Sequence, residues 1–239
     1  MRRFFLDTLS SNLSINADLN VPDELMHRTI NVLRFDKDEV VEFIDGKGLI
    51  VEAKISGTGK SKKFAVTSKR TVKREKPVIG VAVSLIRRER FDLLVEKSVE
   101  LGVDMIIPVE TERSRPFGAD SYPKLKERWQ RIADQALSQC KRPFRCEIND
   151  VIKLTDINKL NGFDEKVFFH FGGDRLNENF VKKGKSHLFI IGPEGGFSPE
   201  EVQLLNDSKI HLYSITNNIL RTETAVFYIL SVTDFLSLN

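Results

Sequence analysis

Cysteine and histidine are scarce in this chain of 239 residues, which contains two cysteines and four histidines. The cysteines, Cys140 and Cys146, form a lone C-x5-C pair in CKRPFRC, which is neither a zinc pattern nor a redox C-x-x-C motif. The histidines are scattered along the chain and form no cluster. We therefore expect two reduced thiols and no metal site.

Long hydrophobic runs are also missing, since no apolar stretch approaches the roughly 20 residues of a membrane span. The start of the chain, MRRFFLDTLS, places basic residues before apolar ones, but Asp7 interrupts an apolar stretch that is too short for a signal peptide. The hydrophobic content of 41% and the charged content of 30% are ordinary for a globular protein. These features predict a cytoplasmic protein with no membrane partner.

Two nucleotide-binding fingerprints are absent as well. The chain has neither the phosphate-loop pattern G-x-x-x-x-G-K-[ST] nor the dinucleotide pattern G-x-G-x-x-G. The first absence argues against a phosphate loop, and the second argues against an oxidoreductase built on an α/β sheet.

The net charge of +3 is unevenly distributed along the chain. Residues 1–75 have 14 Lys and Arg against 11 Asp and Glu, whereas the remaining residues have 23 of each. Within this third, GKSKKFAVTSKRTVKRE (59–75) carries seven basic residues and one acid. Such a stretch suits a polyanion such as nucleic acid. A lysine-rich strand edge that protects against aggregation is the alternative.

The first seventy residues are mostly typical of short strands. Residues 39–55 contain two β-rich runs joined by Asp45-Gly46, which is a hairpin signal. Residues 63–72 alternate as a further strand, and residues 22–34 have a helical period. Several strands and one helix in this length predict a small β-barrel domain.

A charged link that ends in proline, KREKP (73–77), marks a domain boundary, so we expect domains at 1–73 and 74–239. Beyond the link, short apolar runs alternate with helical periods, which is typical of a parallel sheet covered by helices. The expected strands are 78–85, 104–109, 166–171, 187–192 and 211–215, and the expected helices are 90–101, 123–140, 199–206 and 222–237.

The segment IIGPEGGFSPEE (190–201) is a candidate ligand loop between a strand and a helix. Ser198 suits the N-cap, Pro199 the first helical position, and Glu201 completes a capping box. Backbone N–H groups around the two glycines, Gly195 and Gly196, can therefore approach a ligand closely. The carboxylate of Glu194 would repel phosphate, so a cationic or neutral ligand such as S-adenosylmethionine fits better. A structural turn without a ligand is the alternative.

A second strand-to-helix junction has the sequence ILRTETA (219–225). Thr222 can cap the helix that follows, and a cap needs only one such side chain. Arg221 and Glu223 are therefore candidates for chemistry. The alternative is a local surface ion pair between them, which would contribute little to stability.

Together with five other stretches, these two junctions resemble the ribosomal RNA small subunit methyltransferase E family, which belongs to the knotted SPOUT methyltransferases. The other stretches are MRRFF with HRTINVLR (27–34) and DGKG (45–48), EKSVELGVDMIIPVETERS (96–114), and RWQRIADQALSQCKR (128–142). The resemblance implies S-adenosylmethionine-dependent methylation of N3 of a uridine in small-subunit ribosomal RNA, on the assembled subunit. It also implies an α/β fold, in which a PUA-like β-barrel precedes a SPOUT-type parallel sheet with a trefoil knot, and a homodimer.

The resemblance also implies the site residues. Backbone groups of three loops would hold the cofactor in the knot: His170, Phe171, Gly172, Ile191, Gly192, Pro193, Glu194, Gly195, Gly196, Ser214, Ile215, Thr216, Asn218, Ile219, Leu220 and Thr222. From position and residue type we expect Arg221 to stabilise negative charge on the pyrimidine or to hold the nearby phosphate, and Glu223 to accept the proton or orient Arg221. The expected RNA contacts are Arg2, Arg3, His27, Arg34, Arg113, Arg128, Arg131, Gln139 and Arg142. A solvated surface is the alternative for these charges.

The chain departs from the family pattern just before ILRTETA. The family usually has a glycine and a basic residue where this chain has Thr216 and Asn218. The alternative function is therefore a catalytically weak or inactive RNA-binding member of the same fold. The final helix expected at 222–237 is apolar around much of its circumference, which fits burial either in the core or in a homodimer.

Overall fold

The computed structural model describes residues 2–33, 35, 39–57, 62–74, 77–115 and 117–238. The chain divides into two compact units. The first unit consists of Met1–Arg74 with Leu137–Arg145, and the second of Glu75–Ala136 with Cys146–Asn239. The sequence did not predict that a segment from the middle of the chain would join the first unit.

The first unit is built on a five-stranded sheet with the order β1-β3-β4-β5-β2. Its strands are β1 (Arg2–Phe5), β2 (Asp18–Leu19), β3 (Val40–Ile44), β4 (Leu49–Ser56) and β5 (Lys63–Thr71). The pair β1 and β3 is parallel and the other pairs are antiparallel. In the described part of the chain β1 and β2 are the two edges of this sheet.

The hairpin predicted at Asp45-Gly46 is confirmed between β3 and β4. The carboxylate of Asp45 accepts hydrogen bonds from the N–H groups of Lys47 and Leu49, at 2.6 and 2.9 Å. Gly46 has a φ of 72°, a value that favours glycine. The predicted helix is also present, as α1 (Asp23–His27) followed by the π-helical turn η1 (Arg28–Val32).

A buried ion pair lies inside the first unit. The Arg3 guanidinium is 2.9 Å from a carboxylate oxygen of Glu42, and the two side chains are only 5% and 2% exposed. Arg3 also donates to the carbonyl of Lys141, and Arg70 lies 3.5 Å from the other oxygen of Glu42. The prediction that Arg3 contacts RNA therefore needs correction, because its guanidinium is already bound to internal acceptors.

The second unit is built on a parallel sheet of seven strands. The strands are β6 (Ile79–Ser84), β7 (Met105–Glu110), β8 (Glu147–Ile148), β9 (Ile152–Lys153), β10 (Glu165–Arg175), β11 (His187–Ile191) and β12 (His211–Ser214). Their order is β12-β10-β11-β6-β7-β8, and β9 also pairs with β7. The predicted parallel sheet is confirmed. The sequence did not predict β8 and β9, since two residues are too few to show a period.

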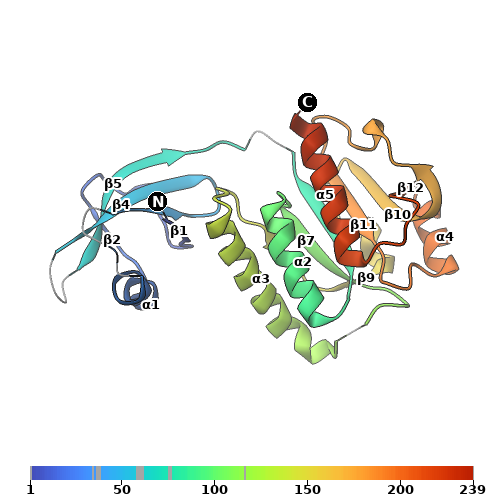
Figure 1. Cartoon of the computed structure of the whole chain (residues 1–239), viewed down its shortest axis with the longest axis horizontal. Helices are drawn as coiled ribbons and strands as arrows, with labels where there is room; N and C mark the ends of the chain where they lie inside the picture. Colours follow the sequence, from blue (N-terminus) through green and yellow to red (C-terminus); the bar gives the residue numbers. More distant parts are fainter. Residues whose placement is uncertain are drawn as a thin grey trace. The chain divides into compact units, whose positions relative to one another are not determined.

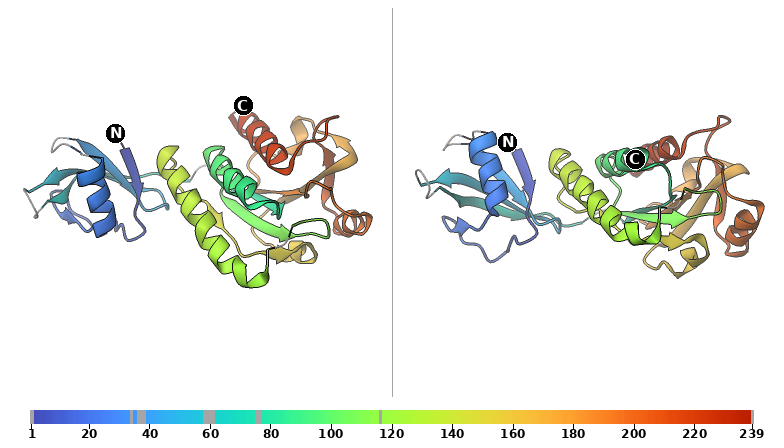
Figure 2. Two further views of the ribbon diagram at one scale, coloured as in Figure 1. Left: turned by 60° about the horizontal axis from the view of Figure 1, so that its bottom comes forward. Right: turned by 90° about the horizontal axis from the view of Figure 1, so that it is seen from below.

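The four predicted helices are confirmed as α2 (Arg88–Glu100), α3 (Tyr122–Gln139), α4 (Pro199–Asp207) and α5 (Thr222–Leu238). Short 3-10 turns lie at η3 (Ala119–Ser121), η4 (Leu154–Lys159) and η5 (Glu178–Phe180). Helices α2 and α5 lie side by side (Figure 1 and Figure 2), and α5 also packs on β6 and β11. Alternate strand residues such as Ala82 and Ile190 form a core with Leu205 of α4.

His187 at the start of β11 is completely buried and held in one tautomer. Its Nδ1 lies 2.8 Å from the carbonyl of Lys185, and its Nε2 accepts the backbone N–H of Lys182 at 3.0 Å. This pattern requires a neutral ring with the proton on Nδ1. Burial, which disfavours the charged ring, lowers the pKa of His187 below its ordinary value.

We expect His187 to make the second unit sensitive to acid. Folding lowers the pKa of His187, so the neutral ring stabilises the folded protein fully at pH values above the ordinary histidine pKa of about 6.5. This stabilisation is lost as the pH falls from that value towards the pKa of the folded state. In His187→Gln, a neutral amide can donate and accept without titrating. Thermal unfolding followed from pH 8 to pH 5 should therefore show a smaller acid loss in His187→Gln than in the wild type. His211→Gln, which replaces an exposed histidine, is the control, and equal losses in wild type and His187→Gln would contradict the prediction.

Candidate functional site

Three neighbouring strands bring the candidate loops to one edge of the sheet. Since β11, β10 and β12 are adjacent and parallel, their carboxyl ends lie at the same edge. In β10 the pairing with β12 is interrupted, because both Phe169 and Asp174 pair with Tyr213. Residues 170–173 therefore bulge out of the β10–β12 ladder, and Gly172 has a φ of 85°.

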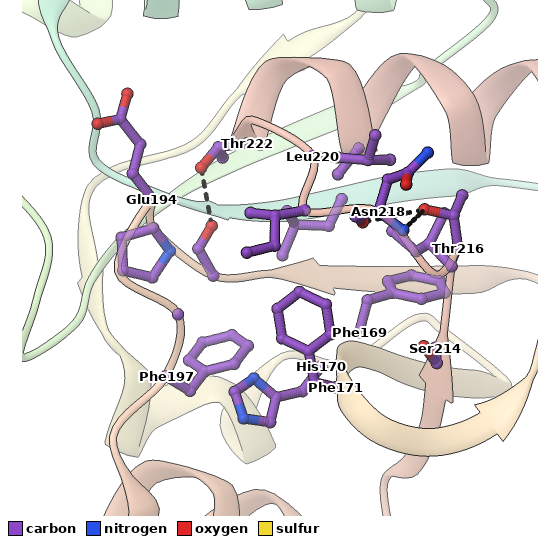
Figure 3. Close-up of a pocket in the computed structure, with 17 residues that line it drawn as sticks. Phe169, His170, Phe171, Glu194, Phe197, Ser214, Thr216, Asn218, Leu220 and Thr222 are labelled. Atoms are coloured by element: carbon purple, nitrogen blue, oxygen red, sulfur yellow. Dashed lines mark hydrogen bonds between the residues drawn. The ribbon is translucent and has the colours of Figure 1, made fainter.

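The loops enclose a pocket of about 610 Å³ that is partly open to solvent (Figure 3). The predicted cofactor residues that line it are His170, Phe171, Ile191, Gly192, Pro193, Glu194, Gly196, Ser214, Ile215, Thr216, Asn218, Ile219, Leu220 and Thr222. Gly172 and Gly195 do not line the pocket. Phe169, Phe197 and Ala225 do, although the sequence did not single them out.

Thr222 links the loop after β12 to the loop after β11. Its hydroxyl donates a hydrogen bond to the carbonyl of Gly192 at 3.0 Å (Figure 3). Thr222 is the first residue of α5 rather than its N-cap, so the expected capping role is replaced by this bond. The capping box predicted for α4 is confirmed, with Ser198 and Glu201 exchanging hydrogen bonds of 2.9 and 3.3 Å.

In the loop after β12, Thr216 occupies the position where the family usually has a glycine. The Thr216 hydroxyl accepts the N–H of Asn218 and donates to the Asn218 carbonyl, both at 3.0 Å (Figure 3). Thr216 is not among the described non-glycine residues with positive φ. A turn held by the Thr216 side chain therefore takes the place of the conformational freedom that a glycine would give. The backbone at Thr216 is not strained.

The loop after β7 supports the glycine turn from outside the pocket. Arg113 donates to the carbonyls of Gly195 and Phe197, at 3.1 and 3.5 Å. The backbone N–H of Glu112 also donates to Glu201 of α4 at 2.8 Å. Arg113 was predicted to contact RNA, but here its guanidinium is directed at the turn that lines the pocket.

His170 lies in the pocket close to the glycine turn. A Cβ placed on Gly196 would be only 3.4 Å from its ring, so the turn approaches the histidine closely. Burial, and to a lesser extent the charge of Arg113, lower the pKa of His170. The pocket therefore presents a neutral imidazole at neutral pH.

The two catalytic candidates lie beside the pocket and differ in burial. Arg221 is exposed, and its side chain makes no ion pair within the part of the chain that the structure describes. Glu223 is 7% exposed, and its Oε2 has no hydrogen-bond partner among the residues that the structure describes. Neither side chain lines the pocket, although their neighbours Leu220 and Thr222 do.

The local ion pair considered between Arg221 and Glu223 is not formed, and Glu223 faces Arg90 of α2 instead. Arg90 Nε lies 3.8 Å from Glu223 Oε1, and Arg90 Nη1 is bound to Glu194 of the glycine turn. Sequence reasoning missed Arg90, although a charged residue just after a parallel strand was a usable signal. The positive charge of Arg90 offsets the negative charge of Glu194. The glycine turn should therefore repel phosphate less than the sequence indicated.

The remaining predicted RNA contacts are surface residues with different surroundings. Arg2 is exposed and lies 5.0 Å from the centroid of the Phe35 ring. Arg128 is bound to Asp92 at 2.7 Å. The exposed residues also include His27, Arg131 and Gln139, whereas Arg142 is half-buried. Arg34 lies outside the described residues.

Within the described ranges, no group of three or more histidine, cysteine, aspartate or glutamate side chains is suitably placed for a metal ion. In the same ranges no helix combines the length and the apolar character needed to span a membrane.

Comparison with known proteins agrees with the geometry of the second unit. The RNA methyltransferase domain family matches residues 74–234. Ribosomal RNA small subunit methyltransferase E of Bacillus subtilis is 26% identical, with 98% of this chain and 96% of that protein covered. The protein of the same name from Aquifex aeolicus is 33% identical over 59% of this chain and 61% of its own.

A solved structure extends this similarity to the whole fold. Ribosomal RNA small subunit methyltransferase E of Neisseria gonorrhoeae, crystallised with bound S-adenosyl methionine, has a TM-score of 0.86 and 29% identity. The superposition covers 99% of this chain and 98% of that one. With a family match over most of its length and the same architecture throughout, this chain belongs to the RNA methyltransferase domain family.

Proposed function

We propose that the protein transfers the methyl group of S-adenosylmethionine to N3 of a uridine in small-subunit ribosomal RNA, on the assembled subunit. The observation that carries the proposal is the convergence of three loops from β10, β11 and β12 on one pocket. Relatives named for methylation of small-subunit ribosomal RNA support the substrate class. The N3 atom and the assembled subunit rest on the resemblance of the sequence motifs.

The residues of the pocket fit S-adenosylmethionine. Phe171, Ile191 and Leu220 offer apolar surface for a flat ring, and the glycine turn offers backbone groups. Close packing explains one of its glycines, because a Cβ on Gly192 would lie 3.2 Å from the ring of Phe197. When bound, S-adenosylmethionine supplies a methyl group made electrophilic by its attachment to a positive sulfur.

The chain's own residues would then act on the pyrimidine. Uridine N3 would lose its proton, so that negative charge develops on the ring, and would bond to the methyl carbon while the bond between that carbon and sulfur breaks and a neutral thioether leaves. Arg221, exposed and without an ion-pair partner among the described residues, is available to stabilise that charge. Glu223 would accept the proton or orient the guanidinium of Arg221. A paired N3 is inaccessible, so the target base must be unpaired or flipped out.

The surfaces for RNA and for a second copy of the chain are part of the proposal. Residues 1–73 would form an RNA-binding domain and 74–239 the methyltransferase domain, whose predicted trefoil knot stays a prediction. The RNA contacts would be Arg2, His27, Arg128, Arg131, Gln139 and Arg142. On α5, Tyr228 and Phe235 are 42% and 66% exposed, and Leu93 of the adjacent α2 is 43% exposed. We propose that a homodimer partner covers these apolar side chains, and that the protein acts in the cytoplasm.

Mass mapping of ribosomal RNA from cells with and without this protein tests the function. We expect one methylated uridine of small-subunit RNA to disappear on deletion and to return on complementation. Purified protein should also transfer labelled methyl groups to subunits from the deletion strain. An unchanged modification map would contradict the proposal. Calorimetric binding of S-adenosylmethionine without any transfer would instead favour the inactive RNA-binding alternative.

Replacing Arg113 by methionine should weaken the binding of S-adenosylmethionine. The change removes the donors to the Gly195 and Phe197 carbonyls, and a charged hydrogen bond contributes about 1.5–3 kcal/mol, so we expect Kd to rise about tenfold or more. Calorimetry measures this value. The control is Arg115→Met, an exposed arginine two residues further on. If Arg113→Met keeps the Kd for S-adenosylmethionine but loses affinity for ribosomal RNA, Arg113 is an RNA contact as the sequence indicated.

A further inference from the structure

Arg90 connects an acid that lines the pocket with an acid that lies beside it. Its side chain, 27% exposed on the first turn of α2, binds Glu194 of the glycine turn through Nη1. Its Nε lies 3.8 Å from Glu223 Oε1 at the start of α5. Glu194 lines the pocket, and Glu223 lies next to Thr222, which also lines it.

The two carboxylates differ in how much they depend on the positive charge of Arg90. The Glu194 side chain is 42% exposed, so water can solvate it without Arg90. The Glu223 side chain is 10% exposed, and a buried carboxylate without a cation is strongly destabilising. Arg90 therefore matters more to Glu223 than to Glu194.

The contact between Arg90 and Glu223 is incomplete in this structure. A separation of 3.8 Å is longer than a hydrogen bond, and Glu223 Oε2 has no partner of its own. A buried carboxylate oxygen without a donor is rare, which makes Glu223 a candidate for a role beyond packing. Glu194 holds Arg90 in this state, and it is also the acid that a molecule entering the pocket would meet.

We infer that Arg90 is a positioning residue that holds Glu223 for methyl transfer, and that Glu194 competes with Glu223 for it. The inference rests on the proposed function. A positively charged ligand in the pocket attracts Glu194 and leaves Arg90 to Glu223. Binding at the glycine turn is thereby coupled to the order of the acid at the start of α5.

The test separates turnover from cofactor binding in the full-length protein. In Arg90→Met we expect kcat for methylation of small subunits to fall about tenfold to a hundredfold, because Glu223 is no longer held. The Kd for S-adenosylmethionine, measured by calorimetry, should stay the same or decrease, because Glu194 is then free to face the pocket. A loss of folding would lower kcat and raise the Kd together, so a fall in kcat without a rise in the Kd identifies positioning. Glu223→Gln should add little to Arg90→Met, since both changes disable the same group.

Lys97→Met is the matched control on the same helix. Lys97 also lies between two carboxylates, 2.8 Å from Glu96 and 2.9 Å from Glu100, and its replacement should change neither value. If Arg90→Met does not fold, Glu194→Gln provides the test. It leaves Arg90 to Glu223 alone, so kcat at saturating S-adenosylmethionine should rise, whereas the Kd for S-adenosylmethionine should increase because the pocket loses an acid.

Three results would overturn the inference while leaving the proposed function intact. They are wild-type kcat in Arg90→Met, parallel losses of kcat and affinity in that variant when it is folded, and a kcat in Glu194→Gln that does not rise at saturating S-adenosylmethionine. If the wild-type protein itself neither binds S-adenosylmethionine nor methylates subunits, the proposed function fails and this inference with it.

Discussion

Replacing Arg221 by alanine is expected to lower kcat/KM for methylation of small ribosomal subunits about 10²- to 10³-fold, the effect of removing one group that stabilises developing charge. The structure explains why the expected fall in kcat/KM is large. Arg221 is exposed at the start of α5, and its side chain has no ion pair among the described residues, so it is available to a substrate. For the same reason the unfolding free energy should change by no more than about 0.5 kcal/mol.

The measurement combines a methyl-transfer assay with calorimetry and thermal unfolding. We expect the Kd for S-adenosylmethionine to remain within about threefold of the wild type, because Arg221 does not line the pocket. Arg115→Ala, at an exposed arginine after a different strand, is the control. Glu223→Gln should also reduce turnover. If Arg221→Ala and Glu223→Gln both keep wild-type turnover, the catalytic roles are wrongly assigned.

Replacing Arg3 by methionine is expected to destabilise the first unit by about 3–5 kcal/mol, because it leaves a buried carboxylate without its main cation. Glu42 is 2% exposed, and its remaining cation, Arg70, lies 3.5 Å away with a side chain that is 55% exposed. Arg3→Met also removes the donor to the Lys141 carbonyl, which belongs to the segment 137–145 of the same unit.

Chemical denaturation of the full chain, followed by a probe in the first unit, measures this loss. Lys63→Met is the control, because Lys63 and Asp18 form an ion pair of 2.6 Å in which both side chains are more than half exposed. That pair is shorter than the 2.9 Å pair of Arg3, yet its loss should cost at most about 1 kcal/mol. Equal losses in the two variants would show that burial does not set the value of the Arg3 pair.

Local patterns in the sequence were sufficient to locate most of the fold. The alternation of apolar runs with helical periods predicted the parallel sheet and α2 to α5, since both periods follow from backbone geometry. The capping box at Ser198 fixed the start of α4, because its partners are three residues apart. The π-helical turn after α1 was not predicted, because a π turn has no distinct sequence pattern.

Contacts between distant residues could not be predicted in the same way. Arg90 and Glu194 are 104 residues apart, and Arg3 and Glu42 are 39 apart, so no spacing rule pairs them. Arg3 was therefore counted as a surface charge and Arg90 was overlooked. Thr216 is a different case. Its bond to Asn218 spans two residues, and threonine is known to form such turns, so this signal was present in the sequence.

The strand order has a consequence for a chain that is made from its amino end. Strand β6 pairs in parallel with β11, and His187 lies opposite Ile79. Each wall of the pocket also comes from β10 or later. One edge of β6 can pair early with β7, but its other edge must wait until β11 has left the ribosome, and such long-range parallel pairing is slow to form. The pocket is consequently the last part of its unit to be completed, so a polypeptide that stops before α5 has no complete site.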